Sequence, residues 1–234
     1  MILEICANSY QSALNAQNAG ANRIELCSEL SVGGITPSHG LLQKVSEKIT
    51  IPVHVLVRPR SGNFCYSKDE FEQIKKDIKI CKDFGFQGIV CGILHSDNTI
   101  DIERTKELVE LSKPLSFTFH RAFDCVTNPK KEILNLIDLG VNRVLTSGQK
   151  EKAIDGIELL KQLKEITENK IIILPGSGIN SENVTYFKKA GFQEIHTSAS
   201  KKVENQNNVF FDKTIQTISD VTNIQEILKN IRNA

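Results

Sequence analysis

The chain has 234 residues, a formal net charge of +1, and charged side chains at 24% of its positions. This balance gives no electrostatic case for a nucleic acid or membrane partner, and no apolar run approaches the roughly 20 residues that a membrane-spanning helix requires. The chain starts with a strand-like stretch that lacks the pattern of a signal peptide. We therefore expect a cytoplasmic protein that binds neither nucleic acid nor a membrane.

Short apolar runs alternate with longer amphipathic stretches eight times along the chain. The predicted strands are residues 2–6, 23–27, 53–57, 88–91, 116–120, 143–146, 171–174 and 194–197. Three helices have clear start signals, namely Thr36-Pro37, Asn128-Pro129 and a capping box from Ser67 to Glu70. Residues 201–219 are polar without a clear period, so we predict an irregular loop there and a last helix over 220–231.

A short pattern recurs before the second, fourth, sixth and eighth predicted strands. Each copy ends a helix and places a glycine where a left-handed residue is needed; these glycines are Gly20, Gly85, Gly140 and Gly191. Repeated βα units without a long linker favour a closed (β/α)8 TIM barrel, which we predict as a single α/β domain over residues 1–234. A doubly wound sheet is the alternative, but no GxGxxG motif follows the first strand.

Alternating positions divide the strand side chains into two sets, because successive side chains point to opposite faces of a sheet. One set is apolar almost throughout and should face the surrounding helices. The other should point into the barrel, and it contains Glu4, Cys6, Arg23, Glu25, Cys27, His54, Arg58, Thr118, His120, Arg143, Ser147, Glu194, His196 and Ser198. Unpaired charges in a packed interior are strongly unfavourable. We therefore predict internal salt bridges for the residues early in their strands, which are Arg23, His54, Arg143 and Glu194.

Five inward residues sit late in their strands, near the end where barrels carry their chemistry: Glu4, Glu25, Arg58, His120 and His196. They form either a functional site or a structural charge network. In an enzyme, Glu4 or Glu25 would be the general base, and His120, held by Asp124 or a neighbour, would be an acid or electrophile. His196 is a further catalytic candidate. No lysine falls at an inward strand end, which argues against a Schiff-base aldolase.

The loops that follow the strands suit an anionic ligand. Arg58 and Arg60 lie on a proline-stiffened loop, and guanidinium groups hold carboxylate or phosphate with two hydrogen bonds. The alternative is that these arginines pair with Glu4, Glu25 or Asp124. The loops after the seventh and eighth strands form the usual phosphate site of barrels. The further candidates for binding an anion are Arg121, Ser147, Gly176, Gly178 and Ser198.

Two of the six cysteines, Cys6 and Cys27, end the first two predicted strands on the inward side. Adjacent strands lie about 4.8 Å apart, so the two sulfur atoms could share one soft ion, such as copper(I) or zinc. The alternative is that both are small buried hydrophobic residues. No CxxC spacing occurs among the six, so neither a zinc knuckle nor a dithiol redox motif is expected.

Seven collinear segments carry a family resemblance: LEIC at 3–6, GANRIELC at 20–27, GGITPS at 33–38, VRPRSGNF at 57–64, FTFHRAFD at 117–124, LTSG at 145–148 and PGSGI at 175–179. As a set they resemble the CutC family, which is named for copper homeostasis. The resemblance implies a cytoplasmic TIM barrel, often a dimer or tetramer, with proposed copper(I) ligands at Cys6 and Cys27. Asn63 stands where an aspartate is common in the family, and Ser177 stands where a glycine is common.

Two hypotheses from different classes follow. In the first, the protein serves copper homeostasis and binds copper(I) through Cys6 and Cys27, with His120 or His196 as a further ligand. In the second, the protein is an enzyme that acts on a small anionic or phosphorylated substrate at the mouth of the barrel. The two hypotheses are compatible, because a thiol pair at an active-site mouth can also bind copper.

Overall fold

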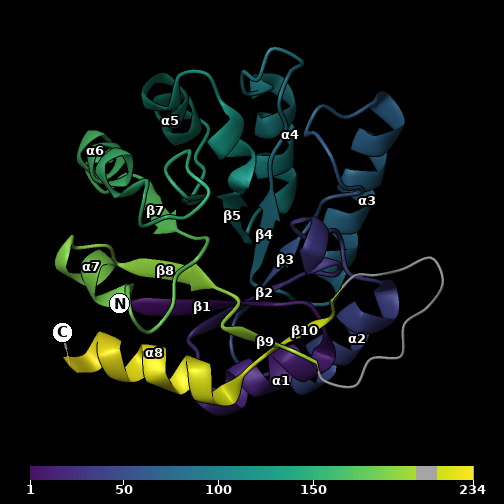
Figure 1. The fold of residues 1–234 in the computed structure, drawn as a ribbon. Coiled ribbons are helices and arrows are strands. Elements are labelled where there is room, and N and C mark those ends of the chain that lie inside the picture. Colours follow the sequence, from purple (N-terminus) through teal and green to yellow (C-terminus); the bar gives the residue numbers. More distant parts are fainter. Residues whose placement is uncertain (204–214, 234) are drawn as a thin grey trace.

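The computed structural model describes residues 1–203 and 215–233, and within these ranges eight parallel strands are surrounded by eight α-helices (Figure 1). The strands are β1 Ile2–Ala7, β2 Arg23–Leu26, β3 Val53–Leu56, β4 Gly88–Cys91, β5 Ser116–Phe119, β6 Arg143–Thr146, β7 Ile172–Pro175 and β8 Glu194–Thr197. The helices are α1 Tyr10–Ala19, α2 His39–Lys48, α3 Lys68–Asp83, α4 Ile102–Ser112, α5 Pro129–Asp138, α6 Ile157–Thr167, α7 Val184–Lys189 and α8 Val221–Asn233. Two short 3-10 turns, η1 Leu30–Val32 and η2 Arg121–Cys125, follow β2 and β5.

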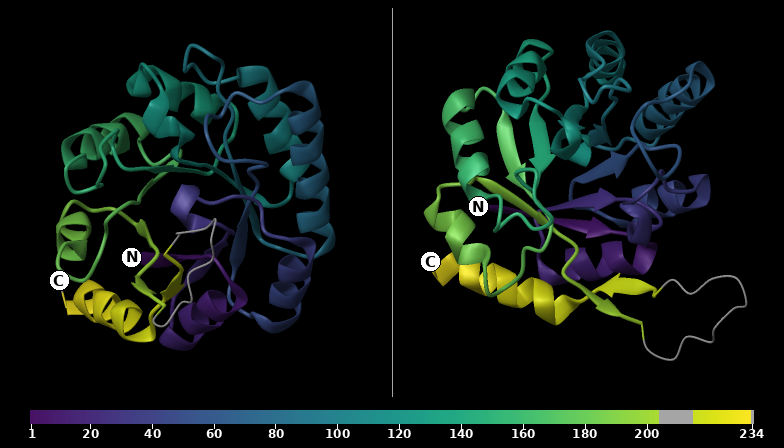
Figure 2. Two further views of the ribbon diagram at one scale, coloured as in Figure 1. Left: turned by 45° about the vertical axis from the view of Figure 1, so that its right-hand side comes forward. Right: turned by 45° about the horizontal axis from the view of Figure 1, so that its top comes forward.

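The strands form one sheet in the order β7-β6-β5-β4-β3-β2-β1-β8. In the described residues, β7 and β8 meet through an isolated parallel bridge between Gly176 and His196, so the barrel is nearly closed. The helices form a ring around the strands (Figure 2). The predicted (β/α)8 TIM barrel is confirmed.

Local signals explain most of the helix boundaries. The Ser67 hydroxyl accepts a hydrogen bond from the Glu70 backbone at 3.2 Å and the Glu70 carboxylate accepts one from the Ser67 backbone at 2.7 Å, which confirms the capping box. The predicted start at Thr36-Pro37 is wrong, because α2 begins after Ser38 instead. Thr36 is held elsewhere, since its hydroxyl oxygen accepts a hydrogen bond from the Arg58 backbone at 2.9 Å.

The end of the chain differs in part from the predicted loop over 201–219. Two short strands, β9 Ser200–Lys202 and β10 Thr217–Ser219, pair antiparallel at the two ends of that stretch. Side chains of α1 and the turn before it hold β10, as when the Asn15 amide donates to the Ser219 carbonyl oxygen at 2.9 Å. The predicted loop over residues 204–214 lies outside the described residues. The last helix, predicted over 220–231, is α8.

The two strand faces are sorted as their alternation predicts. Outward strand residues such as Leu3, Ile24 and Phe117 are buried with apolar residues of the helices in one cluster that draws on elements from β1 to α8. Inside the barrel, a separate small apolar cluster contains Cys6, Cys27, Leu56 and Val90. None of the described helices is long and apolar enough to cross a membrane.

Candidate functional site at the barrel mouth

Charged side chains fill the lower part of the barrel interior as a network of ion pairs, which we call the lower network: Glu4, Arg23, Arg143 and Glu194. Arg23 donates hydrogen bonds to the carboxylates of Glu4 and Glu194, and Arg143 Nε donates to Glu194 Oε2 at 2.8 Å. The salt bridges predicted for Arg23, Arg143 and Glu194 are therefore confirmed. His54 differs, because burial lowers its pKa to about 4 and leaves its ring neutral beside Glu4.

Glu4 joins the lower network to the residues above it. Its Oε1 atom lies 2.8 Å from Nδ1 of His196. Burial alone would raise the Glu4 pKa, but the charge of Arg23 and the bond to His196 outweigh it, so the pKa of this carboxyl falls well below its usual range. Glu4 lies beneath the mouth of the barrel, and among the two predicted base candidates only Glu25 lines the cavity described next.

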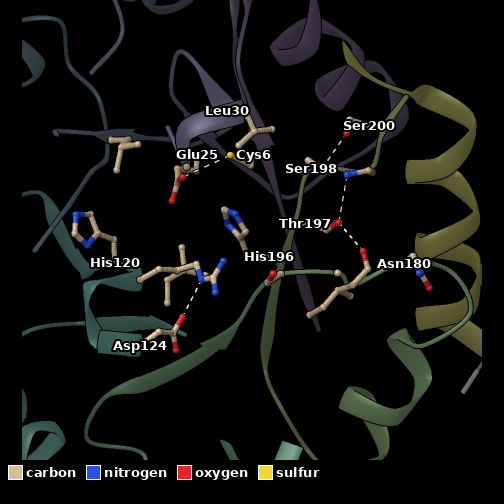
Figure 3. Close-up of a pocket in the computed structure, with 18 of the residues that line it drawn as sticks. Cys6, Glu25, Leu30, His120, Asp124, Asn180, His196, Thr197, Ser198 and Ser200 are labelled. Carbon is tan, nitrogen blue, oxygen red and sulfur yellow. Dashed lines mark hydrogen bonds and ion pairs between the residues drawn. The ribbon is translucent and has the colours of Figure 1, made fainter. Parts of the chain in front are cut away.

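A cavity of about 810 Å³ opens at the C-terminal ends of the strands (Figure 3). We call it the mouth cavity. Nine predicted site residues line it: Cys6, Glu25, Arg58, His120, Arg121, Asp124, Gly178, His196 and Ser198. Five others do not: Glu4, Cys27, Arg60, Ser147 and Gly176.

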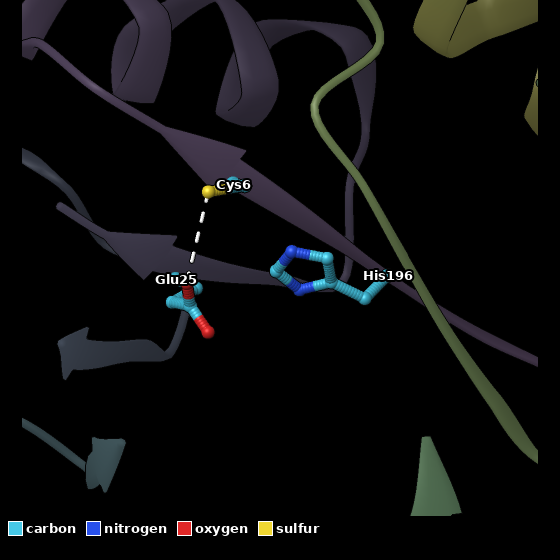
Figure 4. Close-up of side chains that lie close together, drawn as sticks. All are labelled: Cys6, Glu25 and His196. Carbon is cyan, nitrogen blue, oxygen red and sulfur yellow. Dashed lines mark hydrogen bonds between the residues drawn. The ribbon is translucent and has the colours of Figure 1, made fainter. Parts of the chain in front are cut away.

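Three residues that line the mouth cavity lie together with Cys27, whose sulfur atom contacts that of Cys6. We call these four residues the thiol cluster: Cys6, Cys27, Glu25 and His196. The two sulfur atoms lie 3.7 Å apart, and Cys6 Sγ lies 3.6 Å from Glu25 Oε1. One ligand atom from each of Cys6, Glu25 and His196 lies within 4.8 Å of the others (Figure 4). Such a set of donors could hold a soft metal ion.

Strand register and a close glycine build the thiol cluster. Cys6 lies opposite Glu25 in the β1–β2 pairing, while Cys27 follows the end of β2. Gly34 allows the loop after β2 to fold over Cys27, because its φ is +84° and a Cβ atom there would lie only 2.6 Å from the Leu56 side chain. Both thiols are free and buried.

Three groups of the thiol cluster, Cys6, Glu25 and His196, have raised pKa values. The contact with Cys27 and then burial raise the pKa of the Cys6 thiol. Burial, and then the charge of Glu4, raise the pKa of Glu25 to about 7. Burial opposes protonation of His196, but the carboxylates of Glu25 and Glu4 outweigh it and raise its pKa. Cys6 is therefore a thiol at neutral pH, and a metal ion must displace its proton.

Arg58 lines the cavity, and its guanidinium group donates hydrogen bonds to backbone carbonyl groups of the described residues. Its Nη1 atom donates to the carbonyl oxygens of Val32 at 2.9 Å and Gly34 at 2.8 Å, and its Nη2 atom donates to that of Gly62 at 2.9 Å. No carboxylate among the described residues forms an ion pair with it, and its Nε atom is buried without a partner. The alternative in which Arg58 pairs with an inward acid is therefore wrong.

His120 ends β5 and is oriented by the next turn of the chain. Its Nδ1 atom accepts a hydrogen bond from the Ala122 backbone at 3.1 Å, so Nε2 carries the proton of the neutral ring. Burial and then the charge of Arg58 lower the His120 pKa to about 3, which keeps the ring neutral. The Nε2 atom is buried without a partner among the described residues. Gly92 leaves room for the ring, since a Cβ atom there would lie 2.7 Å from Nδ1.

Asp124 supports the loop after β6. Its carboxylate accepts hydrogen bonds from the Thr146 hydroxyl at 2.5 Å and from the backbone of Ser147 and Gln149 at 3.0 and 3.1 Å. Of the two predicted alternatives for the group that holds His120, Asp124 or a neighbour, the contact observed is with a neighbour, because the Ala122 backbone N–H donates a hydrogen bond to the His120 ring. Ser147 is fully buried, and its hydroxyl oxygen accepts a hydrogen bond from Arg121 at 3.0 Å. These contacts make Asp124 and Ser147 parts of the wall that carries Arg121 at the rim.

Of the remaining residues predicted to bind an anion, some line the mouth cavity and others lie outside it. Arg60 forms an ion pair with Glu70 and bonds its own loop, including the Cys65 carbonyl oxygen at 3.0 Å. Gly176 packs beneath His196, where a Cβ atom would lie 3.3 Å from its Cβ. Gly178 and Ser198 line the cavity, and no hydrogen bond from their backbone N–H groups is formed within the described part of the chain.

Parts of the cavity wall were missed by the sequence reasoning. They include Leu30 and Val32 of η1, Phe64, residues 179–182, and Asn223 and Ile227 of α8. Phe64 lies in a segment of the family resemblance, which could have drawn attention to it. The α8 residues carry no local signal, because an amphipathic helix pattern indicates a buried face but not what it faces.

Comparisons with known proteins agree with this fold. A family model described as the CutC family matches residues 1–201. A Proteus mirabilis (strain HI4320) relative named a family protein CutC is 44% identical over 224 residues, which cover 96% of this chain and 88% of the relative. A crystal structure from Streptococcus agalactiae, described as a candidate copper homeostasis protein CutC, has a TM-score of 0.80 at 34% identity and covers 85% of this chain and 98% of that chain. Thiamine phosphate pyrophosphorylase from Pyrococcus furiosus, with a TM-score of 0.62 at 14% identity over 99% of this chain and 96% of that chain, shares the fold alone.

Proposed function

The chain belongs to the CutC family, and from that premise we propose that it serves copper homeostasis by binding copper(I) through Cys6 and Cys27. The observation that carries this proposal is the pair of buried sulfur atoms 3.7 Å apart at the floor of the mouth cavity. Thiolates select copper(I) and zinc over hard metal ions. The strand-end cysteines that the family resemblance points to are the two in this pair.

His196 is the better placed of the two predicted third ligands. It belongs to the thiol cluster, whereas His120 does not. Its Nδ1 atom contacts Glu4 at 2.8 Å, which leaves Nε2 for a metal ion. Metal-binding histidines commonly have their other ring nitrogen on a carboxylate, which orients the ring. Glu25 would add a harder donor, and a site with all four residues would also suit zinc.

The test compares copper(I) binding by the parent, a Cys6→Ser, Cys27→Ser double variant and a Cys65→Ser control. Cys65 is an exposed thiol outside the cavity. Anaerobic competition with a chromophoric copper(I) chelator should show at least about a 1,000-fold loss for the double variant, or about 4 kcal/mol, and no change for the control. Equal binding by the double variant and the parent would refute the proposal. Tighter binding of zinc than of copper(I) would reassign the metal.

A second candidate function, an enzyme acting on a small anionic substrate, is favoured by the size of the cavity. About 810 Å³ is within the usual range for small-molecule sites and far exceeds the space that one ion needs. Native mass spectrometry of gently purified protein tests this candidate. A retained small anion would support it, and its mass would narrow the substrate class.

We also propose a cytoplasmic location and a homo-oligomer, a dimer or a tetramer, as family membership suggests. Light scattering coupled to size-exclusion chromatography measures the oligomeric state directly. A mass of 26.1 kDa at all concentrations would identify a monomer and contradict the proposal.

A further inference from the structure

The charge of Arg58 has no counter-ion among the residues that the structure describes. The side chain is 5% exposed, and buried charges are normally paired with an opposite charge. Its three hydrogen bonds end on neutral carbonyl groups of Val32, Gly34 and Gly62. No carboxylate of the described ranges, 1–203 and 215–233, completes an ion pair. A positive charge fixed in this way at a cavity wall favours an anion inside the cavity.

His120 adds an unsatisfied donor beside this charge. The Phe64 ring joins the two residues, since Arg58 Cζ lies 5.0 Å and the His120 ring 4.9 Å from its centroid. All three residues line the mouth cavity. His120 Nε2–H has no partner among the described side chains and backbone groups, and a buried donor without a partner requires an explanation. A ligand oxygen would supply the missing acceptor.

We infer that the mouth cavity binds a small organic anion, a carboxylate or a phosphate ester, whose charge neutralises Arg58 and whose neighbouring oxygen accepts the hydrogen bond of His120 Nε2. This inference rests on the second candidate function and names its ligand class and its two anchoring residues. Gly178 and Ser198 lie on loops that also line the cavity, and their backbone N–H groups have no partner in the described part of the chain, so they extend the binding surface. The neutral His120 donor suits an oxygen with partial negative charge, such as a carbonyl or carboxylate oxygen.

Two pairs of variants test the separate contributions of Arg58 and His120 to anion binding. Arg58→Met removes the charge, and Arg104→Met is its control, because Arg104 lies on α4 outside the cavity and bonds the Tyr66 carbonyl oxygen at 2.8 Å. His120→Asn keeps an acceptor near the Nδ1 position for the Ala122 N–H but loses the Nε2–H donor. His120→Gln instead keeps a donor near the Nε2 position.

The experiment titrates each folded protein with inorganic phosphate and with malonate by calorimetry, at an ionic strength held constant with sodium chloride. We expect the parent and Arg104→Met to bind at least one anion equally. Arg58→Met should lose at least about 30-fold in affinity, His120→Asn about tenfold, and His120→Gln less than about threefold. The preferred anion of the two distinguishes a phosphate ester from a carboxylate as the natural ligand. The Cys6→Ser, Cys27→Ser double variant should still bind the anion.

Each contrary result has a separate meaning. If the parent binds an anion and both Arg58→Met and His120→Asn bind it equally well, the inference is wrong and the second candidate function stands. If the folded parent binds neither probe and retains no organic anion in native mass spectrometry, both are wrong. Should Arg58→Met fail to fold, because Arg58 ties three loop segments together, the His120→Asn and His120→Gln pair decides the matter.

Discussion

At the bottom of the barrel interior, Glu194 pairs with Arg23 and Arg143, and Arg23 also pairs with Glu4. At the mouth, three groups lack such partners within the described residues: the Arg58 charge, Glu25 Oε2 and His120 Nε2. Both regions are buried, so burial alone does not separate structure from function. The contrast indicates that paired charges stabilise the bottom of the barrel, whereas unpaired polar groups at the mouth are candidates for contacting a ligand.

The lower network gives the largest expected effect on stability. Glu194→Ala leaves Arg143 without a carboxylate and removes one of the two that Arg23 bonds. Breaking a buried pair in this way costs about 3–5 kcal/mol, which chemical denaturation would measure. Glu194→Gln keeps hydrogen-bond acceptors and should cost less. A loss below about 1 kcal/mol for Glu194→Ala would show that the bottom is no more tightly paired than the mouth.

Residues at the mouth should make the free energy of unfolding depend on pH. Burial raises the Glu25 pKa from 4.5 to about 7, so between these values the folded protein keeps a proton that the unfolded chain has released. The free energy of unfolding should therefore fall as pH rises through this window, by up to about 3 kcal/mol, and then level off. His196 acts in the same direction, because its raised pKa gives stability that is lost at higher pH.

Glu25→Gln isolates this contribution. The groups that act on Glu25 are His196, Glu4, Cys6 and Arg23, and Glu4 stays ionised throughout the window because its pKa is lowered. Denaturation of parent and variant at pH 4.5 to 8 should show the variant gaining stability relative to the parent as pH rises. If the difference in free energy of unfolding between parent and variant stayed constant across this pH range, the Glu25 pKa would not be raised in the folded protein.

The smallest effect is expected at Arg60, two positions along the chain from Arg58. Its side chain is 37% exposed and already paired with Glu70, and exposed ion pairs contribute about 0–1 kcal/mol. Arg60→Met should therefore lower the free energy of unfolding by less than about 1 kcal/mol, as measured by urea denaturation. A larger loss would indicate that the loop from Arg60 to Cys65 is a structural element of the mouth.

Strand alternation predicted the fold and the inward residues because both depend on local periodicity. Strand alternation did not predict that Glu4 lies deeper in the barrel than Glu25, because their relative positions along the barrel axis depend on the register between strands. Glu4 lies opposite Arg23, whereas Cys6 lies opposite Glu25, so Glu4 is one inward layer lower. The same limit applies to Arg58 and Arg60, because their different partners come from loops whose paths alternation does not describe. The pairing of β9 with β10 is equally non-local.

The meeting of β7 and β8 has a consequence for where a ligand would bind. The sheet has two free edges there, pinned near the top by the Gly176–His196 bridge and by the Thr197 hydroxyl, which donates to the Ile179 carbonyl oxygen at 2.6 Å. Below these pins, a crevice of about 30 Å³ separates residues of the two sides, such as Ile172 and Phe192. His196 of the thiol cluster is therefore also one of the two residues that join β7 to β8. The loops after both edge strands, residues 177–182 and 198–200, line the mouth cavity, so a ligand that contacts both loops would bridge the two edges of the sheet.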